Sequence, residues 1–122
     1  MSKRVLVIED QEDNRRIVRD LLASAGYDMI EAGTGEEGVT LAEANPPDLI
    51  LMDIQLPGMD GYETTRRIKA NPALRRIPII AVTSYALSGD DAKALEAGCD
   101  AYVTKPFSPR ALLAKIREYL KD

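Results

Sequence analysis

Short apolar runs alternate with longer amphipathic segments along the 122 residues of the chain. The runs predict strands at about 4–9, 28–32, 48–53, 77–82 and 100–104, and the segments between them predict helices near 12–25, 35–45, 61–70, 87–97 and 108–120. This alternation is typical of a parallel sheet with helices on both faces. The runs at 5–8, 49–52 and 79–82 are apolar throughout, which predicts central strands, whereas the more polar second and fifth runs suit the edges.

Local signals mark several helix ends. The first helix has one apolar stripe that we expect to face the core: Ile17, Val18, Leu21, Leu22 and Ala25. Gly26 is the expected C-terminal glycine of that helix. Capping-box spacing occurs at Thr34-x-x-Glu37 and Asp60-x-x-Glu63, and Ser108-Pro109 predicts the start of the last helix.

Composition excludes several classes of function. The length predicts one domain over residues 1–122. Histidine is absent, which excludes serine–histidine and cysteine–histidine catalysis and histidine-ligated metals. Cys99 is the only cysteine, so an intrachain disulfide and a zinc-binding cysteine cluster are excluded; we expect a small, partly buried residue.

Charge and hydropathy bear on partners and location. No apolar run approaches membrane-spanning length and no signal peptide is visible, so we expect a cytoplasmic protein that does not bind membranes. The net charge of −4 argues against direct nucleic-acid binding. The basic clusters Arg15-Arg16-Arg19 and Arg75-Arg76 are expected to be solvated surface, with a partner contact as the second interpretation.

The segment from Gly33 to Gly38 matches the dinucleotide-binding fingerprint G-x-G-x-x-G between a predicted strand and a predicted helix. Two acids, Glu36 and Glu37, would occupy the helix N-terminus where an anionic pyrophosphate should rest. The preceding run is also polar and carries Glu31. We therefore expect these glycines to form a turn, with Thr34 capping the next helix.

Reactive side chains end four of the predicted strands. Glu9 and Asp10 follow the first strand, Asp53 ends the third, Thr83 follows the fourth and Lys105 follows the fifth. The carboxyl ends of parallel strands meet at one edge of an open sheet, and ligands bind there. Adjacent carboxylates repel one another unless a cation lies among them, and Mg²⁺, or Mn²⁺ in its place, prefers such oxygen ligands. An alternative is that Glu9 and Asp10 cap the first helix, and Asp10 could do so besides binding a metal.

A metal at this edge would make Asp53 a plausible nucleophile toward phosphorus. Lys105 would place a positive charge near the phosphoryl oxygens, and the Thr83 hydroxyl could donate a hydrogen bond to them. The sequence therefore predicts a magnesium-dependent phosphoryl site.

Four stretches resemble the receiver domains of two-component response regulators, and the resemblance covers essentially the whole chain. The stretches are Val5-Leu6-Val7-Ile8-Glu9-Asp10, the loop from Asp53 to Gly61 (Asp-Ile-Gln-Leu-Pro-Gly-Met-Asp-Gly), Thr83-Ser84, and Tyr102-Val103-Thr104-Lys105-Pro106-Phe107. The resemblance implies an α/β fold, the flavodoxin-like (βα)5 three-layer sandwich, with a five-stranded parallel sheet in the order 2-1-3-4-5.

The resemblance also implies a role for each residue of the site. Asp53 would accept a phosphoryl group from a histidine kinase or a histidine phosphotransfer protein. Asp10, Asp53 and the backbone carbonyl of Gln55 would bind the metal directly, and Glu9 would help through water. Lys105 would pair with the phosphoryl group, and a cis peptide would join it to Pro106.

An output switch follows from the same resemblance. Phosphorylation would draw the Thr83 hydroxyl toward Asp53, and Tyr102 would turn into the space left behind. The face made by the fourth helix, fifth strand and fifth helix would change and bind a downstream protein effector. Small Ser84 would leave access for the phosphoryl group. Gln55 and Tyr85 would flank the path of attacking water, and we expect bulky Tyr85 to slow self-dephosphorylation.

Three alternatives compete with this interpretation. A phosphatase with an aspartate nucleophile would need an acid two residues after Asp53, where Gln55 stands. A receiver-like module that binds without being phosphorylated would lack the acceptor or the lysine, and neither is missing. A flavin-binding protein would need a hydroxyl- and glycine-rich loop after the first strand. Asp100 is followed by Ala101 instead of a second acid, which favours a monomer, and the chain end after Leu120 predicts a stand-alone switch acting through partners.

Overall fold

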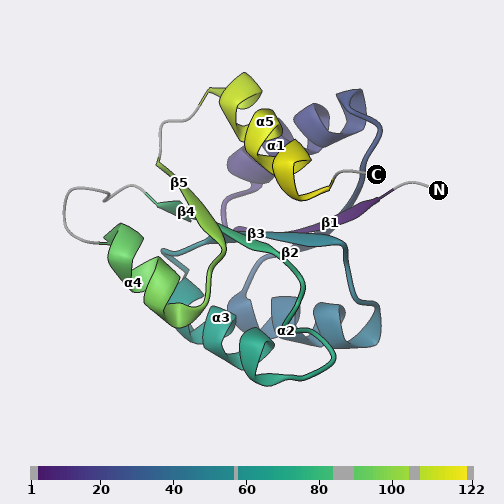
Figure 1. Ribbon diagram of the computed structural model, residues 1–122. Coiled ribbons are helices and arrows are strands. Elements are labelled where there is room, and N and C mark those ends of the chain that lie inside the picture. The colour runs from purple at the N-terminus through teal and green to yellow at the C-terminus, as the bar shows by residue number, and fades with distance from the viewer. Residues whose placement is uncertain (1–2, 57, 84–89, 105–107, 121–122) are drawn as a thin grey trace.

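The structure is a computed structural model that describes residues 3–56, 58–83, 90–104 and 108–120. Strands and helices alternate along it as predicted (Figure 1). The elements are β1 (Arg4–Ile8), α1 (Glu12–Ser24), β2 (Asp28–Ala32), α2 (Gly35–Ala44), β3 (Leu49–Asp53), α3 (Gly61–Ala70), β4 (Ile79–Thr83), α4 (Asp90–Ala97), β5 (Ala101–Thr104) and α5 (Pro109–Tyr119).

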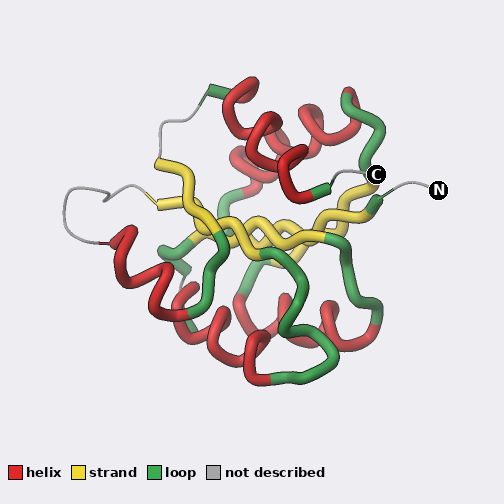
Figure 2. The backbone as a smooth tube through the Cα atoms, viewed as in Figure 1, coloured by secondary structure: helices red, strands yellow, loops and turns green. Residues whose placement is uncertain are grey.

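The molecule has three layers, with the sheet in the middle. Helices α1 and α5 cover one face, and α2, α3 and α4 cover the other (Figures 1 and 2). The strands are all parallel and lie in the order β2-β1-β3-β4-β5, which confirms the predicted fold and the edge positions of β2 and β5. Among the described residues, no helix is both long and apolar enough to cross a membrane.

Strand alternation divides the core into two clusters, one on each face of the sheet. The cluster between the sheet and helices α1 and α5 includes Val5, Val7, Leu49, Leu51, Ile80, Leu112 and Ile116. The cluster on the opposite face includes Leu6, Ile8, Ile50, Met52, Ile68, Ile79 and Ala81. Burial on both faces explains why the three central strands are continuous apolar runs.

One predicted boundary shifts for a local reason, and another is confirmed. Strand β4 begins at Ile79 instead of residue 77, because the Ile77 N–H bonds to the Leu74 carbonyl at 3.0 Å within a turn and Pro78 has no N–H to donate. Helix α1 ends as expected at Gly26, whose φ of 84° is left-handed. The N–H groups of Gly26 and Tyr27 bond to carbonyls inside the helix, the pattern of a Schellman motif.

Helix starts confirm most of the predicted caps. In each case the side chain of the capping residue accepts the backbone N–H of the residue three positions later. The capping residues are Thr34, Asp60 and Ser108. The alternative cap of the first helix was wrong for Asp10, because the N-cap of α1 is Gln11. The Glu9 carboxylate does accept the Gln11 N–H, at 3.1 Å. The apolar stripe of α1 was also wrong at one position: the Ile17 side chain is 51% exposed.

Two glycines of the G-x-G-x-x-G segment allow close packing of α2 and do not form a turn. Gly35 and Gly38 lie inside α2, and neither has a positive φ. A Cβ on Gly35 would collide with the Thr64 hydroxyl of α3, and one on Gly38 would collide with Ile8 of β1. The Gly33 N–H donates to Glu37 at 2.7 Å, so that acid fills the helix N-terminus. The predicted turn is therefore limited to the residues before Gly35, while the Thr34 cap is confirmed.

Candidate functional site

Three carboxylates meet at the carboxyl edge of the sheet. Glu9, Asp10 and Asp53 each offer an oxygen, and these three atoms lie within 4.8 Å of one another. Glu9 and Asp53 are buried, with 6% and 5% of their surface exposed, while Asp10 is half-buried. The structure therefore brings together the acids that the sequence predicted from separate strand ends.

The order of the strands in the sheet explains why these acids lie close together. After β1 the chain turns outward to β2 and then returns to β3 on the other side, so β1 and β3 are neighbours at the point where the order reverses. Their register pairs Ile8 with Met52. The next residue on each strand is an acid, Glu9 on one and Asp53 on the other, and the two acids therefore lie side by side.

The loop after β3 is closed by Gly61. Its N–H donates to the Ile54 carbonyl at 3.0 Å. A Cβ at this position would lie 2.6 Å from the Ile54 Cα and 2.7 Å from the Asp53 carbonyl oxygen. Because only glycine lacks that atom, α3 can begin directly against the backbone that carries Asp53.

Hydrogen bonds from neighbouring residues orient the three carboxylates. The Gln11 N–H donates to Glu9 Oε2 at 3.1 Å, and the Gln11 amide donates to Asp10 Oδ2 at 3.1 Å. The Gln55 N–H donates to Asp53 Oδ1 at 3.0 Å. The Gln55 side chain itself is exposed. Each acid is thus held by the first residues of the loop or helix that follows it.

A divalent cation matches this set of donors. Three like charges this close repel one another, and a metal ion among them converts the repulsion into attraction. Hard carboxylate oxygens, with room for water on the half-exposed side of Asp10, are what Mg²⁺ prefers. Both the type of the oxygen donors and their spacing therefore fit Mg²⁺.

The predicted switch residues lie on neighbouring strands. Thr83 at the end of β4 is 1% exposed, and Tyr102 on β5 is 37% exposed. Tyr102 pairs in register with Ala81, so alternation places Tyr102, Ala81 and Thr83 on the same face of the sheet. Helix α4, which contacts β4 and β5, covers that face.

Four predicted site residues, Ser84, Tyr85, Lys105 and Pro106, lie outside the described residues. Their expected roles remain predictions from the sequence.

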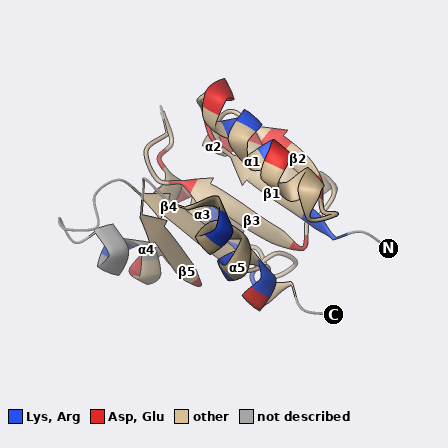
Figure 3. Ribbon diagram, turned by 90° about the horizontal axis from the view of Figure 1, so that it is seen from above, with Lys and Arg blue, Asp and Glu red and all other residues tan. Residues whose placement is uncertain are grey.

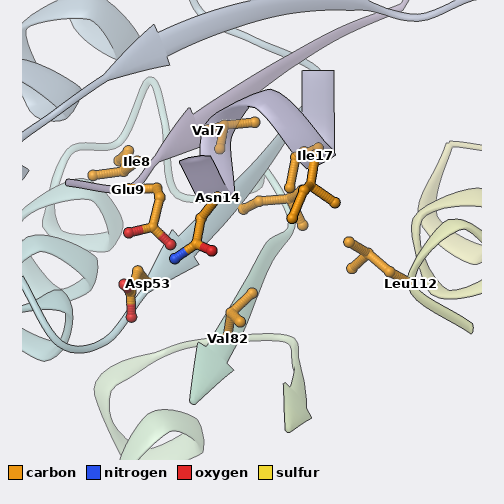
Figure 4. Close-up of a pocket in the computed structure, with 10 residues that line it drawn as sticks. Val7, Ile8, Glu9, Asn14, Ile17, Asp53, Val82 and Leu112 are labelled. Atoms are coloured by element: carbon orange, nitrogen blue, oxygen red, sulfur yellow. The ribbon is translucent and has the colours of Figure 1, made fainter. Parts of the chain in front are cut away.

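A groove leads from the carboxylates between α1 and α5. Glu9, Asp53 and Asn14 lie together at one end of it, and Ile17 and Leu112 lie toward the other (Figure 4). The sequence analysis did not select Asn14. Asn14 is the third residue of α1, and its place in the first turn of the helix that follows the acids is the signal that could have found it.

Comparison with known proteins identifies the family. A model described as the response regulator receiver domain matches residues 5–117. The chain belongs to the response regulator receiver family. The polar-differentiation response regulator DivK of Brucella abortus is 44% identical to it over 122 residues, which cover 100% of this chain and 99% of the relative.

Solved receiver structures share the fold over nearly the whole chain. The receiver domain of the sensor histidine kinase PA1611 from Pseudomonas aeruginosa is 37% identical, with a TM-score of 0.93 and full coverage of both chains. That structure has a magnesium ion coordinated in its active site cleft. Chemotaxis protein CheY4 of Vibrio cholerae is 26% identical, with a TM-score of 0.92, and the match covers 98% of this chain and all of CheY4.

In the basic cluster Arg15-Arg16-Arg19, Arg16 is solvated as expected but Arg15 is not. The Arg15 side chain is 19% exposed, against 64% for Arg16 one position later. Arg15 Nη1 donates to the Glu9 carbonyl at 2.6 Å, and Nη2 donates to Glu12 Oε2 at 2.7 Å. The Arg15 side chain therefore lies against the acid site of the receiver.

Arg19 lies one turn after Arg15 on α1 and extends the same network. Figure 3 shows basic and acidic segments side by side on α1, next to β2. Arg19 donates to both oxygens of Glu31 at 2.6 and 2.9 Å and to Glu12 at 3.1 Å. These hydrogen bonds hold the pKa of Glu31 below its ordinary value of 4.5, and those from Arg19 and then Arg15 do the same for Glu12. The network thus joins α1 to β2 beside the acids.

Proposed function

We propose that this receiver accepts a phosphoryl group on Asp53 in a Mg²⁺-dependent reaction and thereby switches a partner-binding surface. The proposal rests on one observation: an aspartate at the end of β3 lies with two further acids inside 4.8 Å, at the switch point of a parallel sheet.

Asp10 and Asp53 would hold the metal directly, together with the backbone carbonyl of Gln55, and Glu9 would act through a water molecule. When bound, the ion supplies charge neutralisation and polarises a phosphoryl oxygen. The protein's part is to orient the acids, which the N–H groups of Gln11 and Gln55 do by binding one oxygen of Glu9 and of Asp53. An oxygen of the Asp53 carboxylate would attack phosphorus.

Phosphoryl transfer forms one bond and breaks one. An Asp53 oxygen bonds to phosphorus, the bond from phosphorus to the partner's histidine nitrogen breaks, and that nitrogen takes a proton. The phosphodonor is a histidine kinase or a histidine phosphotransfer protein. The sequence-predicted Lys105, together with a cation held by the acids, would balance the charge of the resulting acyl phosphate. Later hydrolysis by water restores the Asp53 carboxylate.

The output step would couple Thr83 to Tyr102. Both side chains are on the sheet face under α4, one buried and one exposed, which is the arrangement a rotating tyrosine requires. The altered surface of α4, β5 and α5 would bind a downstream protein. We propose that the receiver is a monomer, since Asp100 ahead of β5 is engaged within the chain by Lys69 at 3.1 Å and by the Ile79 N–H at 2.8 Å.

Acetyl phosphate provides a direct test. The receiver is incubated with acetyl phosphate and Mg²⁺, or with EDTA, and its intact mass is measured. We expect one added phosphoryl group that is stable in mild acid and labile in base, and that appears only with the metal. Asp53→Asn should abolish it.

Asp13→Asn is the matched control, because Asp13 is an exposed aspartate in the first turn of α1. This variant should be phosphorylated like the unchanged protein. Labelling that persists in Asp53→Asn, or an unchanged protein that takes no phosphoryl group in Mg²⁺, would contradict the proposal.

A further inference from the structure

The Arg15 guanidinium contacts three separate segments beside the acid site. It donates to the Glu9 carbonyl at the end of β1 at 2.6 Å, and it pairs with Glu12 in the first turn of α1 at 2.7 Å. Its Nε lies 3.3 Å from Glu31 Oε1 on β2. A Cβ on Gly33 would lie 3.5 Å from Nη1, so the guanidinium also lies close to the turn after β2.

The shortest of these hydrogen bonds is accepted by a backbone carbonyl, that of Glu9. The carbonyl of Glu9 belongs to the peptide group that joins Glu9 to Asp10. The orientation of that peptide plane sets the directions in which both side chains leave the backbone. On its other side, the Glu9 N–H donates to the Ala32 carbonyl of β2 at 3.0 Å. The backbone that carries two of the three acids is therefore held by β2 on one side and by Arg15 on the other.

Arg15 is itself held in place. Glu12 and Glu31, its two carboxylate partners, both also accept hydrogen bonds from Arg19. Only 19% of the Arg15 side chain is exposed. A planar guanidinium with five N–H donors can bind three acceptors at once in fixed directions, which an ammonium group on a flexible stem cannot.

We propose that Arg15 is a positioning residue for the metal site, which it serves by fixing the Glu9–Asp10 peptide group. This inference rests on the proposed function, since it assumes that Glu9 and Asp10 help to bind Mg²⁺. Residues that orient metal ligands without touching the metal contribute measurably to metal affinity.

Charge and positioning have opposite effects on metal affinity, which makes the inference testable. Arg15 is a cation close to a site for a cation, so removal of its charge alone would tighten Mg²⁺ binding. Loss of the fixed peptide orientation would weaken Mg²⁺ binding. Arg15→Ala removes both the charge and the bond, whereas Arg15→Lys keeps the charge and loses the three-way geometry.

The experiment measures the dissociation constant of Mg²⁺ alone by isothermal titration calorimetry. We expect Arg15→Ala to raise it roughly 3- to 10-fold, less than the 10- to 100-fold typical of groups that bind the ligating side chain directly. Arg15→Lys should raise it at least as much as Arg15→Ala, since the lysine keeps the positive charge near the site and its ammonium group cannot make the fixed contacts of the guanidinium. Arg16→Ala, which removes the neighbouring exposed arginine, should leave it unchanged.

Thermal unfolding in the absence of metal verifies that each variant is folded. If Arg15→Ala does not fold, Glu31→Gln provides the test, because it weakens one contact that orients Arg15 and leaves the bond to the Glu9 carbonyl intact. The dissociation constant of Mg²⁺ for this variant should also rise, but by less. Unchanged or tighter Mg²⁺ binding in folded Arg15→Ala would overturn the inference alone. Failure of the unchanged receiver to bind Mg²⁺ would overturn the proposed function, and this inference with it.

Discussion

The two ends of the sheet use aspartates in opposite ways. At the amino end, Asp48 stands before β3 and accepts the first N–H of its neighbour β1, from Arg4, at 2.8 Å. Asp100 stands before β5 and accepts the first N–H of its neighbour β4, from Ile79, at 2.8 Å. At the carboxyl end, the acids after β1 and β3 face one another within 4.8 Å.

This difference separates stability from chemistry within one sheet. An acid that accepts a strand's first N–H satisfies a backbone donor and stabilises the fold. Acids gathered with like charges destabilise the metal-free fold and are useful only when a cation joins them. The same residue type should therefore respond to substitution with opposite signs at the two ends.

The largest expected effect is at the amino end, at Asp100. Asp100→Ala removes the acceptor of the buried Ile79 N–H and the partner of Lys69, so the free energy of unfolding should fall by about 2–3 kcal/mol. Asp100→Asn keeps an oxygen for that N–H and should lose less. Denaturant unfolding measures both, and calorimetry should show unchanged Mg²⁺ affinity. Equal losses in the two variants would show that charge, not the backbone hydrogen bond, dominates.

The opposite sign is expected at Asp10. Asp10→Asn removes one of three close carboxylates, so the metal-free receiver should gain about 1 kcal/mol in its free energy of unfolding. The dissociation constant of Mg²⁺ should rise at least about tenfold, since a carboxylate that we propose as a direct ligand loses its charge. Asp13→Asn on the exposed side of α1 is the control and should alter neither quantity in this way. A destabilised Asp10→Asn would contradict the comparison between the two ends.

Sequence pattern alone predicted the fold because its signals are local and agree with one another. Apolar runs such as Leu49–Met52 marked strands buried on both faces, and the order 2-1-3-4-5 came with the family resemblance. Boundaries depended on finer contacts. The shift of β4 to Ile79 comes from the bond of Ile77 to the Leu74 carbonyl, which the apolar pattern of the run does not reveal.

The acids of the site were predictable because each ends a strand, and strand ends of a parallel sheet converge. Arg15 was not, because nothing in the sequence distinguishes it from Arg16, the exposed arginine next to it. Only the fold brings Glu31 of β2 and the Glu9 carbonyl to its guanidinium. Asp100 was considered only for its bearing on dimerisation, since its bond to Lys69 spans 31 positions.

Added metal should remove the difference between the two ends. Mg²⁺ at five times its dissociation constant should raise the free energy of unfolding of the unchanged receiver by about 1 kcal/mol, and EDTA should reverse the gain. Asp100→Ala should gain the same amount, because its metal site is intact. Asp10→Asn should gain less at the same Mg²⁺ concentration. The midpoint of denaturant unfolding measures each gain, and an equal response in Asp10→Asn would show that the metal stabilises the fold elsewhere.

The smallest effect concerns the ion pairs that flank the carboxyl end, and it depends on pH. Hydrogen bonds from Arg19 lower the pKa of Glu31 in the folded state below 4.5, so between the two pKa values the unfolded chain binds more protons. The stabilisation from Glu31 is therefore complete above pH 4.5 and is lost as the pH falls through the folded-state pKa. Glu31→Gln should cost less than about 1 kcal/mol at neutral pH, as is typical of partly exposed pairs, and that cost should disappear in acid. Denaturant unfolding of both proteins across this range, with the exposed Glu96→Gln as control, measures the difference. A cost that stays constant with pH would show that Glu31 acts through packing and not through its charge.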